Sequence, residues 1–354
     1  MRYATAFCAA LLFSQVLFAA PPLGLPPAPI PRDNPQSPAK IALGRLLFND
    51  RRFSADGSIS CSSCHRPELA FTDSLPVAQG IRGIKGTRNS PTVVNAAYYT
   101  SLFLDGRRDS LETQALDPLV NPIEHGLNDH RFVVDVVRKD PDYPARFQTV
   151  FGVDTDQITI DHVVKAIASY ERTLISGNSP FDRYFFGGDR TALSASAARG
   201  LNLFRRKGNC ANCHEISWNN ALFTDNRFYN IGVGYDHLEP SIDAYLESLR
   251  RSTKAGTKPA GSLLTDAQRS ELGRFNVTGV VADIGKFRTP TLRNIEKTGP
   301  YMHDGSQKTL EEVVEYYDKG GEKNPYLDPA IFPLKLTDQE KTDLVAFLQS
   351  LTSP

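Results

Sequence analysis

Two copies of the five-residue pattern Cys-x-x-Cys-His constrain this 354-residue chain more than any other feature: Cys61-Ser-Ser-Cys64-His65 and Cys210-Ala-Asn-Cys213-His214. In such a pattern the two thiols can add to the vinyl groups of a porphyrin, while the adjacent His reaches its iron from one side. A redox-active cysteine pair does not need His at the next position twice, and a zinc ribbon would not hold its two pairs so far apart. The sequence therefore predicts two covalently bound haem c groups.

The first twenty residues have the profile of a secretory signal peptide. Arg2 precedes an apolar run over residues 4–13, and small alanines come just before a proline-rich stretch. Residues 1–20 are therefore predicted to be a cleaved signal peptide and the mature protein to be periplasmic. Pro21 is unfavourable directly after a cleavage site, so the cut is expected within a residue or two, and a buried N-terminal helix is the alternative. Without this segment, every remaining cysteine belongs to a haem pattern, which leaves none for a disulfide.

Composition excludes several other classes of protein. The chain has 40 basic and 40 acidic side chains, which argues against a strongly basic nucleic-acid binder. No internal segment has the 18 or more apolar residues expected of a membrane-spanning helix. With 40% hydrophobic residues, the chain can bury a sizeable core and is long enough for two domains. We therefore expect no nucleic-acid partner and no membrane span.

Each haem pattern follows a similar predicted helix, in which Gly44 or Gly200 precedes a phenylalanine by four residues. A small residue lets a helix approach a flat partner closely, so these glycines are predicted to pack near a haem edge. Two ordinary amphipathic helices are the alternative. Together with the haem patterns, the repeat predicts two related haem domains, over residues 21–185 and 186–354.

Apolar residues elsewhere recur with the 3.6-residue period of helices rather than with the alternation of strands. Further helices are predicted over residues 110–119, 128–139, 160–175, 309–317 and 337–351. Ser110 has a capping pattern, and Thr337 begins a capping box with Glu340. Strands are scarce, and the charged segment 232–266 is predicted to be a loop or an insertion. The predicted fold class is mainly α, with two cytochrome c-like haem domains in tandem.

Several stretches between the haem patterns are as distinctive as the patterns: Gly86-Thr-Arg-Asn-Ser-Pro-Thr92, Phe103-Leu-Asp-Gly-Arg107, Ser110-Leu-Glu-Thr-Gln114, Asn121-Pro-Ile-Glu124, Phe287-Arg-Thr-Pro-Thr-Leu-Arg-Asn294 and Gly299-Pro-Tyr-Met-His-Asp-Gly305. With them, nearly the whole chain after the signal peptide resembles the bacterial dihaem cytochrome c peroxidase family, including its MauG branch. The resemblance implies an N-terminal peroxidatic haem, a C-terminal electron-transfer haem and a calcium ion between them.

The resemblance assigns roles to residues near the N-terminal haem. Glu124 falls where the family has its distal acid/base carboxylate, and Gln114 matches a distal Gln that can hydrogen-bond bound peroxide. A Glu beside an apolar haem face loses solvation, which raises its pKa toward a useful range; a solvated carboxylate at a helix end is the alternative. The other histidines in this region and beyond are interpreted as structural or surface residues: His125, His130, His162 and His237.

The same comparison implies an open N-terminal iron. Classical members of the family carry a distal His in a Ser-Ile-Gly-His stretch, which closes this iron until the second haem is reduced. The matching stretch here, Ala78-Gln-Gly-Ile81, contains no His. We therefore expect a permanently open haem that needs no reductive activation, as in the MauG branch.

The second haem is predicted to have an axial tyrosine. Classical members of the family place a Met ligand fourteen residues after the His of the Pro-Tyr-x-His motif; Tyr317 stands at that distance from His303 and matches the axial Tyr of the MauG branch. Met302 is the one Met that follows the signal peptide, and it lies beside the motif His instead. Tyr316 and Met302 are the alternative ligands. A phenolate is a hard anionic donor, so this haem is expected to have a low potential and to tolerate Fe(IV).

Three positions depart from the family pattern. Leu104 replaces the Trp that lies between the haems, so charge sharing between them is expected to be weaker or to take another path. Gly208 replaces a surface Trp of the MauG enzyme that matures tryptophylquinone, and that activity is therefore not transferred. The chain's single Trp, Trp218, is either a core or a surface residue.

Asn89, Thr298 and Pro300 align with the family's calcium ligands, a side-chain oxygen and two backbone carbonyls completed by waters. Hard oxygen donors suit Ca²⁺. The alternative for Asn89 is that it only shapes the turn before Pro91.

The leading functional hypothesis is a peroxidase that reduces hydrogen peroxide with electrons from a small c-type cytochrome or a cupredoxin. A MauG-like oxidase acting on protein side chains is one alternative. A non-catalytic dihaem electron carrier or peroxide sensor is the other, and it predicts that both irons are six-coordinate.

Overall fold

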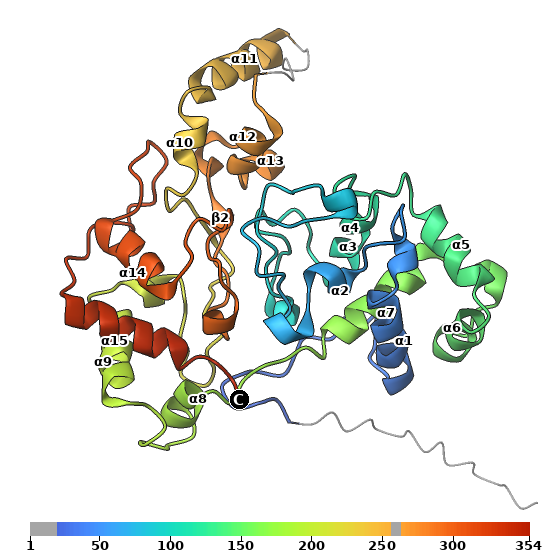
Figure 1. Cartoon of the computed structure of the whole chain (residues 1–354), viewed down its shortest axis with the longest axis horizontal. Helices are drawn as coiled ribbons and strands as arrows, with labels where there is room; N and C mark the ends of the chain where they lie inside the picture. Colours follow the sequence, from blue (N-terminus) through green and yellow to red (C-terminus); the bar gives the residue numbers. More distant parts are fainter. Residues whose placement is uncertain (1–19, 256–262) are drawn as a thin grey trace, which may run out of the picture.

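The computed structural model of the protein describes residues 20–255 and 263–354, so residues 1–19 of the predicted signal peptide lie outside the described part. Two mainly helical halves lie side by side (Figure 1). One contains α1 to α7 and the other α8 to α15, which confirms the predicted fold class. The domain boundary near residue 186 stays a prediction. In the described ranges no helix is long and apolar enough to cross a membrane.

The N-terminal half contains seven α-helices, several of them one turn long: α1 (Pro38–Phe48), α2 (Cys61–Cys64), α3 (Leu111–Gln114), α4 (Leu116–Val120), α5 (Arg131–Lys139), α6 (Tyr143–Phe151) and α7 (Ile160–Glu171). Predicted helix 110–119 is divided into α3 and α4. Ser110 caps α3 as expected, because its side chain accepts a hydrogen bond from the backbone N–H of Thr113 (3.2 Å).

Over its described residues, 180–255 and 263–354, the C-terminal half contains eight α-helices: α8 (Pro180–Phe185), α9 (Ala195–Arg205), α10 (Tyr235–Leu238), α11 (Ile242–Ala255), α12 (Asp266–Glu271), α13 (Phe275–Thr278), α14 (Leu310–Lys319) and α15 (Asp338–Gln349). Two short strands, β1 (Phe228–Tyr229) and β2 (Phe287–Arg288), pair antiparallel, with Phe228 opposite Arg288. The capping box predicted at the start of α15 is present, since Thr337 accepts from the backbone N–H of Glu340 and Glu340 accepts from that of Thr337.

In each half the helix before the haem pattern crosses the last helix of that half at a glycine. A Cβ atom on Gly44 of α1 would overlap the carbonyl oxygen of Ala166 in α7, and one on Gly200 of α9 would overlap that of Asp343 in α15. The glycines therefore let two helix backbones touch. The prediction that they pack near a haem edge was wrong, because a helix backbone occupies the space that each glycine leaves.

This crossing predicts a large stability effect for a small substitution. The variant Gly200→Ala is expected to lower the free energy of unfolding by about 1–3 kcal/mol, because α9 and α15 must separate to admit a methyl group. The matched control is Asn202→Ala, on the exposed side of the same helix, which should change stability by less than about 0.5 kcal/mol. Urea unfolding measures both, and equal midpoints for the two variants would contradict this account of the crossing.

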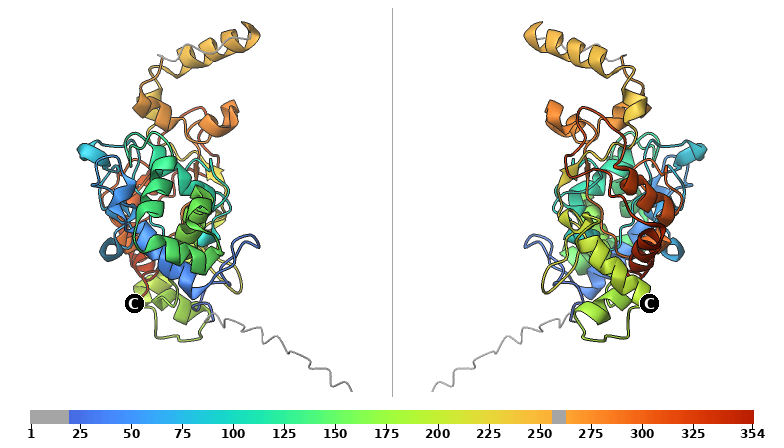
Figure 2. Two further views of the ribbon diagram at one scale, coloured as in Figure 1. Left: turned by 90° about the vertical axis from the view of Figure 1, so that its right-hand side faces the viewer. Right: turned by 90° about the vertical axis from the view of Figure 1, so that its left-hand side faces the viewer.

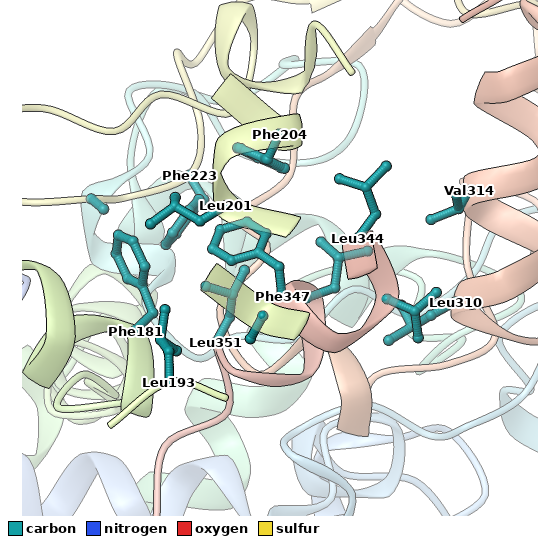
Figure 3. Close-up of a cluster of buried hydrophobic side chains, with 14 of the residues drawn as sticks. Phe181, Leu193, Leu201, Phe204, Phe223, Leu310, Val314, Leu344, Phe347 and Leu351 are labelled. Atoms are coloured by element: carbon teal, nitrogen blue, oxygen red, sulfur yellow. The ribbon is translucent and has the colours of Figure 1, made fainter. Parts of the chain in front are cut away.

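A separate hydrophobic core supports each helix crossing. The N-terminal core joins α1 and α7 to α5 and α6 through buried side chains that include Leu43, Leu47, Val133, Phe147 and Ile167. In the C-terminal core, Leu201 and Phe204 of α9 face residues from α14, from α15 and from the turn just after it (Figure 3): Leu310, Val314, Leu344, Phe347 and Leu351. Phe204 and Phe347 lie 4.9 Å apart between ring centroids. Each haem pattern therefore follows a helix that is held in place by the hydrophobic core of its own half.

The segment predicted as a loop or insertion is partly helical, so that interpretation was wrong over α10 and α11. Leu238, Ile242 and Leu246 recur every four residues and are buried in a third hydrophobic cluster with Leu272 and Phe275. Abundant charge on the other faces concealed this period in the sequence. Helix α11 stands away from the rest of the molecule in both side views (Figure 2).

A buried ion pair fastens the N-terminal segment to the second half. The guanidinium of Arg293 is 1% exposed and donates to both carboxylate oxygens of Asp182 (2.8 and 2.9 Å). It also donates to the carbonyl oxygens of Ala221 and Gly24 (both 2.8 Å). Each of the three guanidinium nitrogens therefore donates at least one hydrogen bond, and the carboxylate balances the charge, as burial of a guanidinium requires.

Candidate functional site

The first haem pattern presents its histidine in a form suited to metal binding. Helix α2 spans the two cysteines, and the backbone N–H of His65 donates to the carbonyl oxygen of Cys61 (3.0 Å). The ring Nδ1 of His65 lies 3.2 Å from the carbonyl oxygen of Phe71. A carbonyl oxygen only accepts, so Nδ1 carries the proton and Nε2 keeps its lone pair for a metal.

The second haem pattern repeats this arrangement. The backbone N–H of His214 donates to the carbonyl oxygen of Cys210 (2.9 Å), and its Nδ1 lies 2.9 Å from the carbonyl oxygen of Phe223. Phe71 and Phe223, which supply the two carbonyls, both have positive φ angles, 60° and 54°. Burial lowers the pKa of both His65 and His214, which favours the neutral imidazole that ligates iron.

The cysteines of both patterns are free thiols, so none of the four described cysteines is used in a disulfide: Cys61, Cys64, Cys210 and Cys213. Burial raises the pKa of all four thiols. Four reduced cysteines, each pair one residue before a histidine with an available Nε2, fit two covalently attached haem groups.

A cavity of about 260 Å³ opens beside the second pattern, and its wall contains Cys210, Cys213 and His214. Leu104 lines the same cavity from the N-terminal half, so the two halves meet there. Tyr317 of α14 also lines it. A mainly apolar cavity with an imidazole and a phenol in its wall fits a haem with His and Tyr axial ligands.

The three candidate axial ligands differ in their surroundings. The phenol of Tyr316 donates to the carbonyl oxygen of Ile231 (2.9 Å) and accepts from the backbone N–H of Glu322 (3.3 Å), so it is engaged away from the cavity. Tyr317 lines the cavity, and its ring is perpendicular to that of Tyr316. Met302 is also in the cavity wall. Burial raises the pKa of Tyr317, so a bound metal would have to favour the phenolate.

Near the first pattern, Glu124 lies in a turn after α4 with its carboxylate partly withdrawn from solvent. Burial raises its pKa and Asp117 adds to the rise, whereas Arg107 and a hydrogen bond from Asn121 Nδ2 to Oε1 (2.7 Å) oppose it. The charge of Glu124 in turn contributes to the raised pKa of Cys64. The carboxylate is therefore close to the haem pattern and held in one orientation, which suits proton transfer.

The loop that lacks the distal His packs directly on Glu124. The backbone N–H of Ile81 donates to the carbonyl oxygens of Ile123 (3.0 Å) and Glu124 (3.1 Å), and a Cβ on Gly80 would overlap the former. Gln79 turns its amide to the carbonyl oxygen of Gly83 (3.1 Å). The loop over this side of the site therefore presents no imidazole.

Gln114 is the last residue of α3, and its side chain makes no hydrogen bond to any residue of the described ranges. His125 is buried, with Nδ1 2.8 Å from the carbonyl oxygen of Phe53, whereas His130 bonds to the carbonyl oxygen of Leu116 (3.0 Å). His162 takes part in the cap of α7. These contacts agree with structural roles for these three histidines.

The three predicted calcium ligands all line this cavity: Asn89, Thr298 and Pro300. Asn89 donates its amide to the carbonyl oxygen of Leu75 (2.7 Å), and no described residue donates to its Oδ1. A free amide oxygen is compatible with a calcium ligand, and the calcium ion stays a prediction.

Sequence reasoning missed Glu271 of α12, which reaches the same cavity wall through His303. Its Oε2 lies 2.6 Å from Nε2 of His303, and the imidazole stacks on Phe287 at 3.7 Å between ring centroids. Only the motif around His303 pointed to this region. Glu271 follows a segment whose helices the charge pattern concealed.

Trp218 is a surface residue, with 88% of its area exposed, so the core alternative was wrong. Gly208 lines the cavity beside the second haem pattern.

Two family models match the chain in tandem, di-haem cytochrome c peroxidase over residues 38–191 and cytochrome c over residues 197–352. The chain is 43% identical over 337 residues to the cytochrome-c peroxidase IdrP1 of Denitromonas iodatirespirans, covering 94% of this chain and 86% of that protein. The chain belongs to the di-haem cytochrome c peroxidase family. As a member of this family it is an oxidoreductase with two haem c groups.

Two further comparisons connect this family member to MauG. It is 39% identical over 323 residues to the methylamine utilization protein MauG of Methylorubrum extorquens, covering 91% of this chain and 81% of that protein. It also superposes on the crystal structure of a MauG-like protein associated with microbial copper homeostasis, with a TM-score of 0.76, 35% identity and 94% coverage of each chain. Both comparisons agree with the tandem fold.

Proposed function

We propose that this family member is a periplasmic peroxidase that reduces hydrogen peroxide with electrons from a small redox protein. Peroxide would bind opposite His65, and electrons would enter at the centre held by His214 and Tyr317. The contrast between the two centres supports this proposal most. A phenol lines the cavity beside His214, whereas the loop over Glu124 carries no imidazole.

At the N-terminal centre, the bound haem would supply an iron that accepts peroxide and transfers electrons to it. Glu124 would accept a proton from one peroxide oxygen and return it to the other, which would leave as water. Asn121 holds the carboxylate for this transfer through its 2.7 Å hydrogen bond. Gln114 donates a hydrogen bond that orients the bound peroxide. Each hydrogen peroxide takes up two electrons and two protons and yields two water molecules.

The electron donor would be a small c-type cytochrome or a cupredoxin. The similarity to MauG supports a second candidate, in which the electrons come from an oxidisable side chain of a protein substrate. Leu104 stands where the family has a Trp between the haems. An aliphatic side chain cannot carry oxidising equivalents from one haem to the other, so this residue does not favour the second candidate.

The proposal predicts the electron paramagnetic resonance (EPR) spectrum of the ferric protein and its response to peroxide. The spectrum should contain one high-spin and one low-spin haem signal, because one iron is open and the other has two axial ligands. One equivalent of peroxide should then remove both ferric signals and produce a state oxidised by two electrons. An electron carrier or sensor would instead give two low-spin signals that peroxide leaves unchanged.

A further inference from the structure

Glu171 is a buried carboxyl group that the proposed reaction does not use. It is the last residue of α7 and continues the buried helix face formed by Val164 and Ala168. Only 4% of Glu171 is exposed, and its Oε2 has no hydrogen-bond partner in the part of the chain that the structure describes. A carboxyl group in such a place is stable when neutral, because ionisation would leave an uncompensated charge in the core.

The neighbouring charges do not form an ion pair with Glu171. Arg172 donates Nη2 to Oε2 of Glu112 on α3 (2.7 Å), and its other terminal nitrogen, Nη1, has no partner among described residues. On α1, Lys40 donates to the side-chain oxygen of Asn34 (3.0 Å). On α5, Arg138 donates to the carbonyl oxygen of Ile158 (2.8 Å). Lys165 of α7 pairs with Asp161 (3.0 Å), so apart from Nη1 of Arg172 these positively charged groups are engaged with other acceptors.

Burial raises the pKa of Glu171 to about 8; Arg172 opposes this rise, and Glu112 adds to it. Without a haem the group is therefore mainly protonated at neutral pH, and the positive charge of a nearby ferric haem would shift it toward the carboxylate.

The end of α7 that carries Glu171 is also close to the first haem pattern, because the ring of Tyr170 packs on Phe48 (5.3 Å between centroids), and Phe48 lies 6.4 Å from the ring of His65. Its charge is the largest contribution, after burial itself, to the raised pKa of the Cys61 thiol. Cys61 packs against the N-terminal core, to which α7 contributes Val163, Ala166 and Ile167. A haem attached through Cys61 therefore has Glu171 within electrostatic range, in an interior where charge interactions are stronger than in water.

We propose that Glu171 is the proton-uptake site that is coupled to reduction of the N-terminal haem. An electron from a one-electron donor goes to the iron and removes one positive charge from the site. A proton from solvent then binds to the carboxylate of Glu171, so the buried charge changes little. Reoxidation releases the proton. The coupling requires only a haem on Cys61 and Cys64, and it holds whether or not the protein turns over peroxide.

The test is the pH dependence of the reduction potential in the haem-loaded full chain. A His65→Ala variant first identifies which EPR signal belongs to the N-terminal haem. The reduction potential of this haem is then measured by following that signal during a redox titration. In the wild type it should fall as pH rises from about 7 to 9, by at most about 59 mV per unit, which is the equivalent of a tenfold change for one electron. Glu171→Gln keeps the shape of the side chain and cannot ionise, so it should remove most of this slope.

The matched control is Glu68→Gln, an exposed carboxylate close to the same haem pattern, which should keep the wild-type slope. Equal slopes in wild type and Glu171→Gln would overturn the proposal. Infrared difference spectra of the wild type need no variant. Reduction should produce a protonated-carboxyl band that shifts in D₂O, and its absence would also overturn the proposal. Neither result depends on peroxidase activity, which the reaction with peroxide tests separately.

Discussion

The variant Glu124→Gln should react with hydrogen peroxide about two to four orders of magnitude more slowly than the wild type, the range expected for loss of a proton-transfer group. Glutamine has nearly the same shape and can still form a hydrogen bond with Asn121, so the surrounding turn should remain in place. Stopped-flow mixing with peroxide measures the rate. The spectrum of the ferric haem before mixing should not change, since the variant removes no ligand.

The pH dependence of the same rate tests the role more closely. Glu124 must be ionised to accept the peroxide proton, so the rate should fall as the pH drops through its pKa. Burial raises this pKa, which moves the fall to a higher pH than an exposed glutamate would give. Asn121→Ala removes a hydrogen bond that favours the ionised form of Glu124, so the decrease in rate should occur at a still higher pH. Glu124→Gln should lose this limb of the profile.

A matched substitution elsewhere separates this role from a general effect of lost charge. Glu68→Gln changes an exposed carboxylate close to the first haem pattern and should keep both the wild-type rate and its pH profile. A Glu124→Gln variant that reacts at full speed would remove Glu124 from the proposed mechanism. Gln114 would then be the remaining distal candidate.

The sequence predicts those parts of this fold in which a local pattern and the tertiary structure agree. The caps of α3 and α15 are examples, because Ser110 and Thr337 bond to the backbone only three residues away. The two haem patterns are local for the same reason. A short segment brings two thiols and an imidazole to one side, whatever the rest of the chain does.

Other features depend on partners that the local sequence does not reveal. Gly44 and Gly200 both allow another group to pack closely against their helix. The residues near them in the sequence do not indicate whether that group is a haem or a second helix. The period of Leu238, Ile242 and Leu246 is regular, yet surrounding charges made the segment resemble a loop. Glu171 carried a usable signal, a polar residue at an apolar position of α7. That its Oε2 has no hydrogen-bond partner among the residues described is visible only in three dimensions.

The second large effect is expected at α14. Tyr317→Phe should abolish the low-spin signal of the C-terminal haem in the ferric EPR spectrum, because the variant removes only the phenol oxygen that would bind the iron. The aromatic ring still fills the cavity, so the haem should remain attached. The reduction potential of this centre should rise, since an anionic oxygen ligand stabilises the oxidised metal. Redox titration followed at the haem absorption bands measures that change.

Tyr316→Phe is the matched control on the neighbouring residue. It loses the hydrogen bonds to the Ile231 carbonyl and the Glu322 N–H, which should cost about 1 kcal/mol of stability, while the low-spin signal stays unchanged. Met302→Leu should likewise leave the signal unchanged. If Met302→Leu alters the signal and Tyr317→Phe does not, the axial ligand is the thioether.

Helix geometry explains why adjacent tyrosines should behave so differently. The residues of α14 that line the cavity recur at helical spacing along one face: Leu310, Val313, Val314 and Tyr317. One residue earlier, Tyr316 lies about 100° around the helix from Tyr317, is not part of the cavity wall, and donates its phenol to the carbonyl oxygen of Ile231. A one-residue change therefore moves the phenol from the cavity wall to a different surface. The pair of variants accordingly tests the position of the oxygen while leaving the composition of the helix the same.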